Sequence, residues 1–165
     1  MKDRMQDSAA LEASIKNGRE PEPVRVLVID DNAPDVMLIS ESLRDQGMTF
    51  EITHLRDGEE AVSKLAKDPS EFYSYDLIVL DLNMPRVSGF EVLSSFRGAA
   101  ELSKIPILVL TSSLAPDEQE EVRRLGADRY LNKPADLYEF LSAVGSIVRE
   151  LVPRVGLKDE NAGTA

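Results

Sequence analysis

Polar side chains that could carry out chemistry stand directly after several short apolar segments of the chain. Asp30 and Asp31 follow VRVLVI, Asp81 follows LIVL and Thr111 follows IPILVL, while Lys133 follows RYLN, which is half polar. A strand that is apolar on both faces is buried, and an unpaired carboxylate within it would cost several kcal/mol. We therefore expect Asp81 to lie at the end of its strand, where it can meet other polar groups.

Gathered in one place, these residue types support phosphoryl transfer to a carboxylate. Three close carboxylates repel one another in a low dielectric, so they need a cation or must bind protons. Mg²⁺ meets this need, because it combines carboxylates with water and phosphate oxygens. A carboxylate can also act as a nucleophile and form an aspartyl phosphate, whose charge Lys133 and the Thr111 hydroxyl could help to surround. The sequence thus predicts Asp81 as the phosphate acceptor, followed by a turn at Asn83 that can present a backbone carbonyl to Mg²⁺.

The segments between these groups alternate between apolar strands and amphipathic helices. We expect strands at 24–29, 50–55, 77–80, 105–110 and 129–131, and helices at 33–46, 58–67, 89–97, 116–125 and 137–151. Strands separated by helices of this length form right-handed crossovers, which give a parallel sheet with helices on both faces. Ligands of such α/β sheets bind outside the carboxyl ends of the strands. The polar residues should therefore meet at one edge.

Composition and charge exclude several classes of function. With 165 residues, 42% hydrophobic and 30% charged, the chain fits one globular domain, and its apolar runs are far shorter than the roughly 20 residues of a membrane helix. A net charge of -11 argues against nucleic-acid binding. The chain contains no cysteine, which rules out disulfides and cysteine zinc sites. The N-terminus has scattered charges and no apolar signal-peptide core, so we expect a cytoplasmic protein.

Four segments, VLVIDD, LIVLDLNMPRVSGFEVL, IPILVLTSS and GADRYLNKP, resemble the receiver domain of two-component response regulators. Asp81 precedes Thr111 by 30 residues and Thr111 precedes Lys133 by 22, as the resemblance requires. Separated positions in the right order are more specific than one short motif. The resemblance covers residues 24–152 and implies a flavodoxin-like, doubly wound five-stranded sheet with the strand order 2-1-3-4-5. Residues 1–23 are then a flexible N-terminal extension, and residues 153–165 a tail too short for an effector domain.

The resemblance assigns phosphorylation to Asp81 and Mg²⁺ binding to Asp30, Asp31, Asp81 and the carbonyl of Asn83. The family's phosphoryl donor is a histidine of a sensor kinase or a phosphotransfer protein. The only histidine here, His54, is expected at the surface or the edge of the core rather than in catalysis. The phosphoryl group should therefore come from another protein.

The resemblance also assigns roles around the phosphate. Lys133 would bind it, with a cis peptide bond between Lys133 and Pro134. Thr111 and Tyr130 would act as switch residues that respond to it, and the small side chain of Ser112 would leave the acceptor accessible. Apart from this resemblance, Thr111 could be a simple cap of the next helix, and Tyr130 could be a half-buried strand residue.

The expected protein is a single-domain regulator that is not an enzyme, beyond assisting its own phosphorylation and dephosphorylation. Its output would be binding to a downstream protein, with a homodimer through helix 116–125, strand 129–131 and helix 137–151 as a further expectation. The segments DPSEFYSY, YDLIVLDLNMPR and DDNAPDVMLI are similar to regulators paired with phytochrome-type kinases.

Two other functions remain open at this point. A haloacid-dehalogenase-like phosphatase also forms an aspartyl phosphate with Mg²⁺, but it needs a second aspartate two residues after the nucleophile, where this chain has Asn83. A receiver-like adaptor that works without phosphorylation usually lacks one of the acidic, acceptor or lysine positions. All of them are present here.

Overall fold

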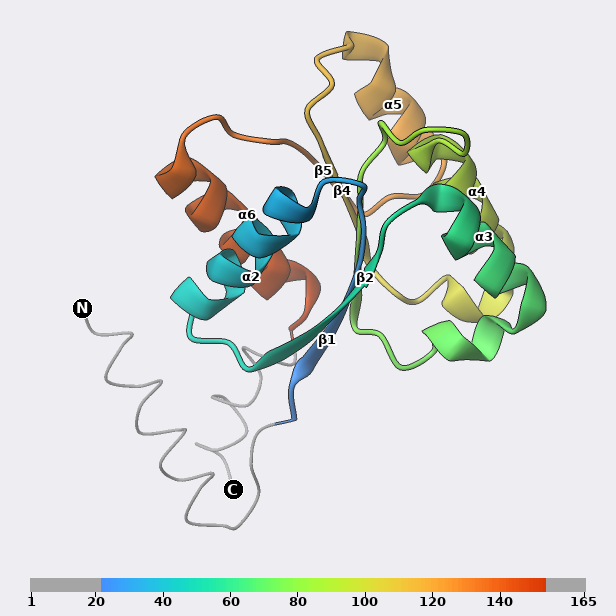
Figure 1. Ribbon diagram of the computed structural model, residues 1–165, viewed down its shortest axis with the longest axis horizontal. Helices are drawn as coiled ribbons and strands as arrows, with labels where there is room; N and C mark the ends of the chain where they lie inside the picture. Colours follow the sequence, from blue (N-terminus) through green and yellow to red (C-terminus); the bar gives the residue numbers. More distant parts are fainter. Residues whose placement is uncertain (1–21, 154–165) are drawn as a thin grey trace.

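The computed structural model describes residues 22–153, which form three layers with a parallel sheet in the middle (Figure 1). Its strands lie in the order β2-β1-β3-β4-β5. They are β1 (Val24–Ile29), β2 (Phe50–Leu55), β3 (Leu77–Leu80), β4 (Ile107–Thr111) and β5 (Arg129–Asn132). The doubly wound five-stranded fold predicted from the sequence is confirmed.

Helices cover both faces of the sheet. One face carries α2 (Ala33–Asp45) and α6 (Leu137–Leu151), and the other carries α3 (Gly58–Lys67), α4 (Gly89–Gly98) and α5 (Pro116–Arg124) (Figure 1). Two short 3₁₀ helices, Pro69–Phe72 and Ala100–Leu102, complete the order of elements. No helix within residues 22–153 combines the length and apolar character that crossing a membrane requires.

The central strands are buried on both sides, as their unbroken apolar sequence predicts. Every residue of β3 and β4 is buried, and successive residues of β1 enter different cores. Val26 and Val28 pack in the core beneath α2 and α6, whereas Leu27 and Ile29 pack in the core beneath α3 and α4. Because both cores depend on these strands, the strand ends are held at fixed positions.

The register of the sheet brings the strand ends together. Ile29 of β1 pairs with Leu80 of β3, and Leu80 pairs with Val109 of β4. The amide of Asp81 donates a hydrogen bond to the carbonyl of Ile29 over 3.0 Å. The residues that follow β1 and β3 are consequently neighbours at the carboxyl edge.

Several element boundaries differ from those expected. β4 begins at Ile107 rather than at residue 105, because Pro106 has no N–H and the amide of Ile107 donates to the Asp128 carboxylate over 2.8 Å. β5 extends one residue beyond the expectation, to Asn132, while α2 and α5 each end one residue earlier. The two 3₁₀ helices were not predicted, and they place Phe72 and Leu102 in the core. The predicted terminal extensions lie almost entirely outside the described residues.

Candidate functional site

Three carboxylates meet where β1 and β3 end. Asp30, Asp31 and Asp81 each offer an oxygen, and these oxygens all lie within 4.8 Å of one another. Asp30 is 2% exposed and Asp81 5%, whereas Asp31 is exposed. The prediction that these residues share one edge is confirmed, and the buried pair lies next to a more open third carboxylate.

Backbone groups hold the two buried aspartates in place. The amide of Asn32 donates to Asp30 Oδ1 over 2.8 Å, and the amide of Asn83 donates to Asp81 Oδ1 over 3.4 Å. On the neighbouring edge strand, Nε2 of the half-buried His54 lies 2.7 Å from the carbonyl oxygen of Asp30. A carbonyl only accepts, so His54 is the donor and supports this backbone. His54 lies at the edge of the core, as expected.

Lys133 reaches into this cluster from the end of β5. Its Nζ lies 2.6 Å from Asp35 Oδ2, 3.1 Å from Asp30 Oδ2 and 3.7 Å from Asp81 Oδ2. Its amide donates to the carbonyl of Thr111 over 2.7 Å, which ties the start of this loop to β4. The ammonium group therefore lies among three carboxylates, two of them buried.

The expected cis peptide bond is not found. The described residues contain no cis peptide, so the bond between Lys133 and Pro134 is trans and that prediction is wrong. The trans isomer of an X–Pro bond is favoured by roughly 0.5–1 kcal/mol, and the chain reaches the three carboxylates in this form.

Burial and charge shift the pKa values of the site. Burial raises the pKa of Asp81 to about 6, with repulsion from Asp30 and Asp31 adding to the rise and attraction to Lys133 opposing it. Burial also raises the pKa of Asp30, against the hydrogen bond from Asn32 and the charge of Lys133. Burial alone would lower the pKa of Lys133, but its hydrogen bond to Asp35 and the other carboxylates raise the pKa above its ordinary value.

A hard divalent cation fits this set of donors. The three clustered carboxylates supply oxygen ligands alone, which suits Mg²⁺, Mn²⁺ or Ca²⁺ better than softer metals. Burial raises the pKa of both Asp30 and Asp81, because each carboxylate loses water that would solvate its charge, and repulsion between the carboxylates adds to the rise. A cation would supply the missing positive charge.

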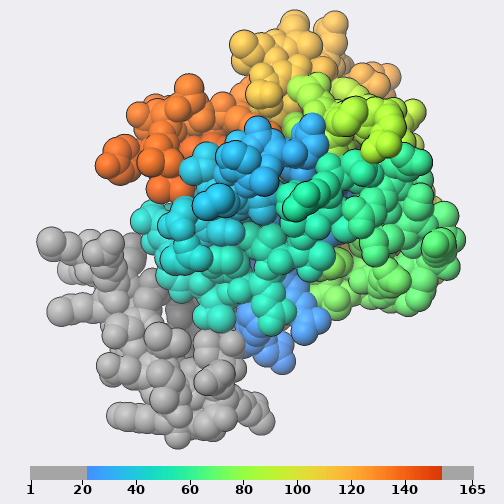
Figure 2. All heavy atoms as spheres, viewed as in Figure 1, coloured from blue at the N-terminus to red at the C-terminus, as the bar shows by residue number. Residues whose placement is uncertain are grey.

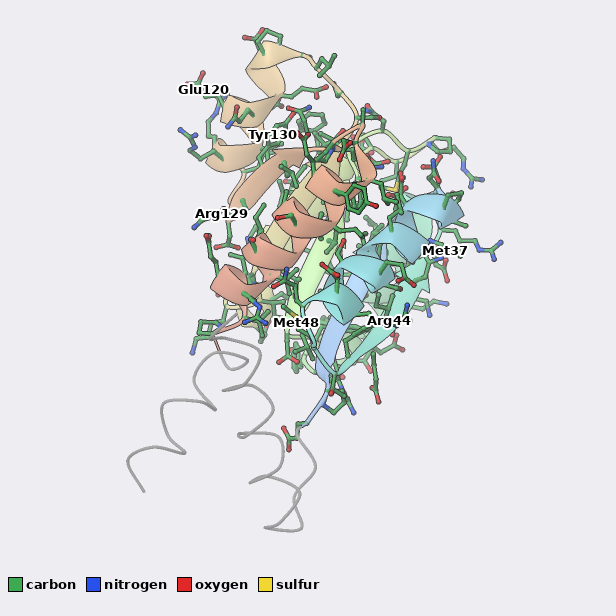
Figure 3. All side chains as sticks on the ribbon, turned by 90° about the vertical axis from the view of Figure 1, so that its left-hand side faces the viewer. Met37, Arg44, Met48, Glu120, Arg129 and Tyr130 are labelled. Atoms are coloured by element: carbon green, nitrogen blue, oxygen red, sulfur yellow. The ribbon has the colours of Figure 1, made fainter. Side chains whose placement is uncertain are left out.

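The predicted switch residues lie on β4 and β5, with Thr111 as the last residue of β4 and Tyr130 as the second residue of β5. Thr111 is fully buried, and its Oγ1 accepts hydrogen bonds from Asn83 Nδ2 over 3.3 Å and from the amide of Ser113 over 3.2 Å. Tyr130 is half-buried next to α5, with its hydroxyl 3.5 Å from the carbonyl of Ser113 (Figure 3). Ser112 is exposed, and its role in leaving the acceptor accessible stays a prediction.

Two residues at the site were not singled out by sequence reasoning. Gly89 begins α4 so close to the acceptor that a Cβ atom would lie 2.3 Å from the carbonyl oxygen of Asp81. Asp35, in the first turn of α2, makes the shortest contact to Lys133. The sequence could have indicated Asp35, because it lies in the first turn of the helix that follows β1, and that turn must lie at the carboxyl edge of the sheet.

Sequence comparison identifies the family. The family model of the response regulator receiver domain matches residues 26–145. The chain is 35% identical over 142 residues to the response regulator MprA of Mycolicibacterium vanbaalenii, covering 86% of this chain and 58% of that protein. It is 36% identical over 126 residues to the cell cycle transcriptional regulator CtrA of Caulobacter vibrioides, covering 76% and 51%. The chain therefore belongs to the response regulator receiver family of two-component systems, and it spans about half the length of these curated relatives.

Solved structures show the same fold over nearly their whole length. The phosphorylated cyanobacterial phytochrome response regulator RcpA matches with a TM-score of 0.69 and 32% identity, over 78% of this chain and 93% of that chain. The Mn²⁺-bound form of the response regulator Rcp1 matches with a TM-score of 0.68 and 31% identity, over 79% and 95%. The chemotaxis protein CheY4 of Vibrio cholerae gives 0.60 and 30%, over 78% and 98%.

Proposed function

We propose that this protein is a cytoplasmic response regulator that accepts a phosphoryl group on Asp81, with Mg²⁺ as cofactor, and signals by changing what its surface binds. One observation carries the proposal: the buried Asp81 carboxylate lies in a cluster of three carboxylates, with the Lys133 ammonium 3.7 Å away. This combination offers a nucleophile, a cation site and a positive group for the transferred phosphate.

The chemistry follows from the positions of these groups. An Asp81 oxygen attacks the phosphorus of a phosphohistidine, the P–N bond breaks, and the histidine of the donor protein leaves with the electron pair. Asp30, Asp31 and Asp81, with the carbonyl of Asn83, would hold Mg²⁺, which supplies charge neutralisation when bound. Lys133 would pair with a phosphoryl oxygen, since its ammonium already faces the acceptor.

The output would start at Thr111. Its hydroxyl oxygen is buried at the end of β4 and accepts from Asn83 and Ser113, and a phosphoryl group on Asp81 would offer the hydroxyl hydrogen a charged acceptor. A shift of Thr111 would free space for Tyr130 and change the surface of α5, β5 and α6. The change is a population shift, limited by the better fit of phosphate to one state.

The partners follow from the family and from the neighbours in fold. Response regulators receive phosphate from histidine kinases or phosphotransfer proteins, and the likeness to RcpA and Rcp1 supports a phytochrome-type kinase. We propose no activity on external substrates, because Asn83 stands where an aspartyl-phosphate phosphatase needs a general acid and its amide group donates to Thr111. A homodimer through α5, β5 and α6 is part of the proposal.

Intact mass spectrometry after incubation with acetyl phosphate and Mg²⁺ tests the acceptor. We expect a gain of about 80 Da, one phosphoryl group, that disappears with Asp81→Asn or without the metal. Asp45→Asn, an exposed aspartate at the far end of α2, is the matched control and should gain the same mass. A gain that persists in Asp81→Asn would place the phosphate elsewhere and contradict the assignment.

A further inference from the structure

Asp35 makes the closest contact to Lys133 and lies outside the metal cluster. Its Oδ2 is 2.6 Å from Lys133 Nζ, against 3.1 Å for Asp30 and 3.7 Å for Asp81. Both side chains of the closest pair are largely buried, at 18% and 11% exposure. The three carboxylates grouped as a cation site are those of residues 30, 31 and 81, without Asp35. The strongest partner of Lys133 is thus a residue with no place in the proposed metal or acceptor set.

The hydrogen bonds of the ammonium group define what remains for phosphate. A lysine ammonium has three N–H donors and no acceptor. Asp35 and Asp30 lie within hydrogen-bond distance and take two of them, whereas the distance to Asp81 is that of an ion pair without a hydrogen bond. One donor therefore remains, and Asp81, the acceptor on which a phosphoryl group would stand, is the third carboxylate around the ammonium at 3.7 Å.

Asp30 is the less dependable of the two partners. It is also a candidate metal ligand, and a carboxylate that binds a divalent cation has less charge to offer a neighbouring ammonium. A divalent cation at this distance also repels Lys133 directly. Asp35 does not share its carboxylate with the cation site, so it can hold Lys133 when the metal is bound.

Local hydrogen bonds hold the backbone of Asp35 at the position from which its side chain contacts Lys133. Asn32 caps α2, with its side chain accepting from the Asp35 amide over 3.3 Å and its carbonyl accepting from the same amide over 3.1 Å. The first turn of a helix also favours a carboxylate, because the helix dipole is positive there. In the space-filling view α2 lies at the surface between the first part of α6 and α3 (Figure 2).

We propose that Asp35 is a positioning residue for phosphoryl binding: it holds the Lys133 ammonium in the site when Asp30 is engaged by the metal, so that one N–H stays directed at the phosphoryl group on Asp81. The inference rests on the proposed function and adds a residue to it. Asp35 acts through Lys133 and need not touch the phosphate itself.

Binding of beryllium trifluoride, which adds to an aspartate oxygen as a tetrahedral phosphoryl mimic, tests this with saturating Mg²⁺. Titrations followed by calorimetry and by fluorine NMR give the affinity of the wild type, Asp35→Asn and Asp35→Glu. We expect Asp35→Asn to weaken binding about fivefold or more, since a charge-assisted hydrogen bond is lost, and Asp35→Glu to restore part of the affinity. Equal or tighter binding by Asp35→Asn would overturn the inference.

A matched control and a double-mutant cycle separate positioning from a general effect of charge. Glu41→Gln removes one carboxylate from the same helix, where Glu41 pairs only with the exposed Arg44 among the ion pairs of the described residues, and should change the affinity less than about twofold. In a Lys133→Met background, Asp35→Asn should have no further effect. A loss of the same size without Lys133 would overturn the inference. Failure of the wild type to bind the mimic would instead contradict the proposed function, and the inference with it.

Discussion

The carboxyl group of Asp81 is harder to ionise in the folded protein than in the unfolded chain. Burial is the main reason, and Lys133 does not fully offset it because Asp30 and Asp31 add repulsion. A carboxylate placed only for stability would be paired so that its pKa falls. The arrangement suits a group that binds a cation and receives a phosphoryl group. The cation would pair with the carboxylates, and the phosphoryl oxygens would pair with Lys133.

This arrangement gives a pH dependence of known sign. With its pKa raised to about 6, Asp81 keeps a proton in the native state that the unfolded chain has released above about pH 4, so the free energy of unfolding falls as pH rises through that window. We expect Asp81→Asn to be about 1–3 kcal/mol more stable than the wild type at pH 7 without metal, and equally stable below pH 4. Urea unfolding at several pH values measures this, with Asp45→Asn as control. An unchanged difference across the pH range would contradict it.

The residues that sequence reasoning found are those that follow the ends of apolar strands. Asp30 and Asp81 directly follow such segments, and Lys133 follows the short strand β5, so the rules of parallel sheets bring them together. The contact of Asp35 with Lys133 depends on side-chain conformations, and the isomer of the Lys133–Pro134 bond depends on the path of one loop. Neither is encoded in periodicity, so the first was missed and the second was predicted wrongly.

At the scale of elements, the start of α4 is fitted against the acceptor. A Cβ atom on Gly89 would lie 2.3 Å from the Asp81 carbonyl oxygen and 2.6 Å from Leu82 Cα, and backbone atoms cannot move aside cheaply. We expect Gly89→Ala to cost about 2–3 kcal/mol of stability and to slow phosphorylation by displacing Asp81. Gly98→Ala, at the other end of α4, meets no atom within 4 Å and should be neutral or up to about 1 kcal/mol stabilising. Thermal unfolding compares the two, and equal stabilities would contradict the close fit.

Arg97 joins α4 to the segments before β4 and β5. Its guanidinium donates to the carbonyls of Gly126 over 2.7 Å and Ile105 over 3.0 Å, and pairs with Asp128 over 2.8 Å. We expect Arg97→Met to lose about 2–4 kcal/mol, because these carbonyls and the Asp128 carboxylate would lose the hydrogen bonds of a largely buried guanidinium. Arg129→Met, which breaks an exposed pair with a glutamate of α6, should cost less than about 1 kcal/mol. Chemical unfolding distinguishes them.

The order of the elements followed from the sequence more closely than their boundaries did. Strands apolar on both faces and helices with one apolar stripe specify alternating elements, and the crossover rule then gives a parallel sheet. Boundaries depended on contacts between distant residues, such as the bond from Ile107 to Asp128. The 3₁₀ helix Ala100–Leu102 also depends on a side-chain contact, because its Leu102 carbonyl accepts from Arg97 over 3.1 Å.

At the scale of the whole molecule, a net charge of -11 makes any cation stabilising to some degree, so specific binding of Mg²⁺ must be separated from screening. Sodium chloride at matched ionic strength supplies the screening alone. Bound metal adds stability that grows with concentration over the dissociation constant, about 2.7 kcal/mol at one hundred times that constant. In a domain of this size that raises the melting temperature by about 5–10 °C.

We therefore expect Mg²⁺ to raise the melting temperature well beyond matched sodium chloride, and Asp30→Asn to remove that excess because it replaces a buried carboxylate of the cluster with a neutral amide. Glu120→Gln, an exposed change on α5 (Figure 3), should keep the full response, because Glu120 is not one of the clustered carboxylates. The excess should shrink below pH 6, since protons compete with the metal for Asp81, whose pKa burial raises to about 6. Differential scanning calorimetry measures all three. An equal response in Asp30→Asn and Glu120→Gln would mean that Mg²⁺ acts only through the overall charge.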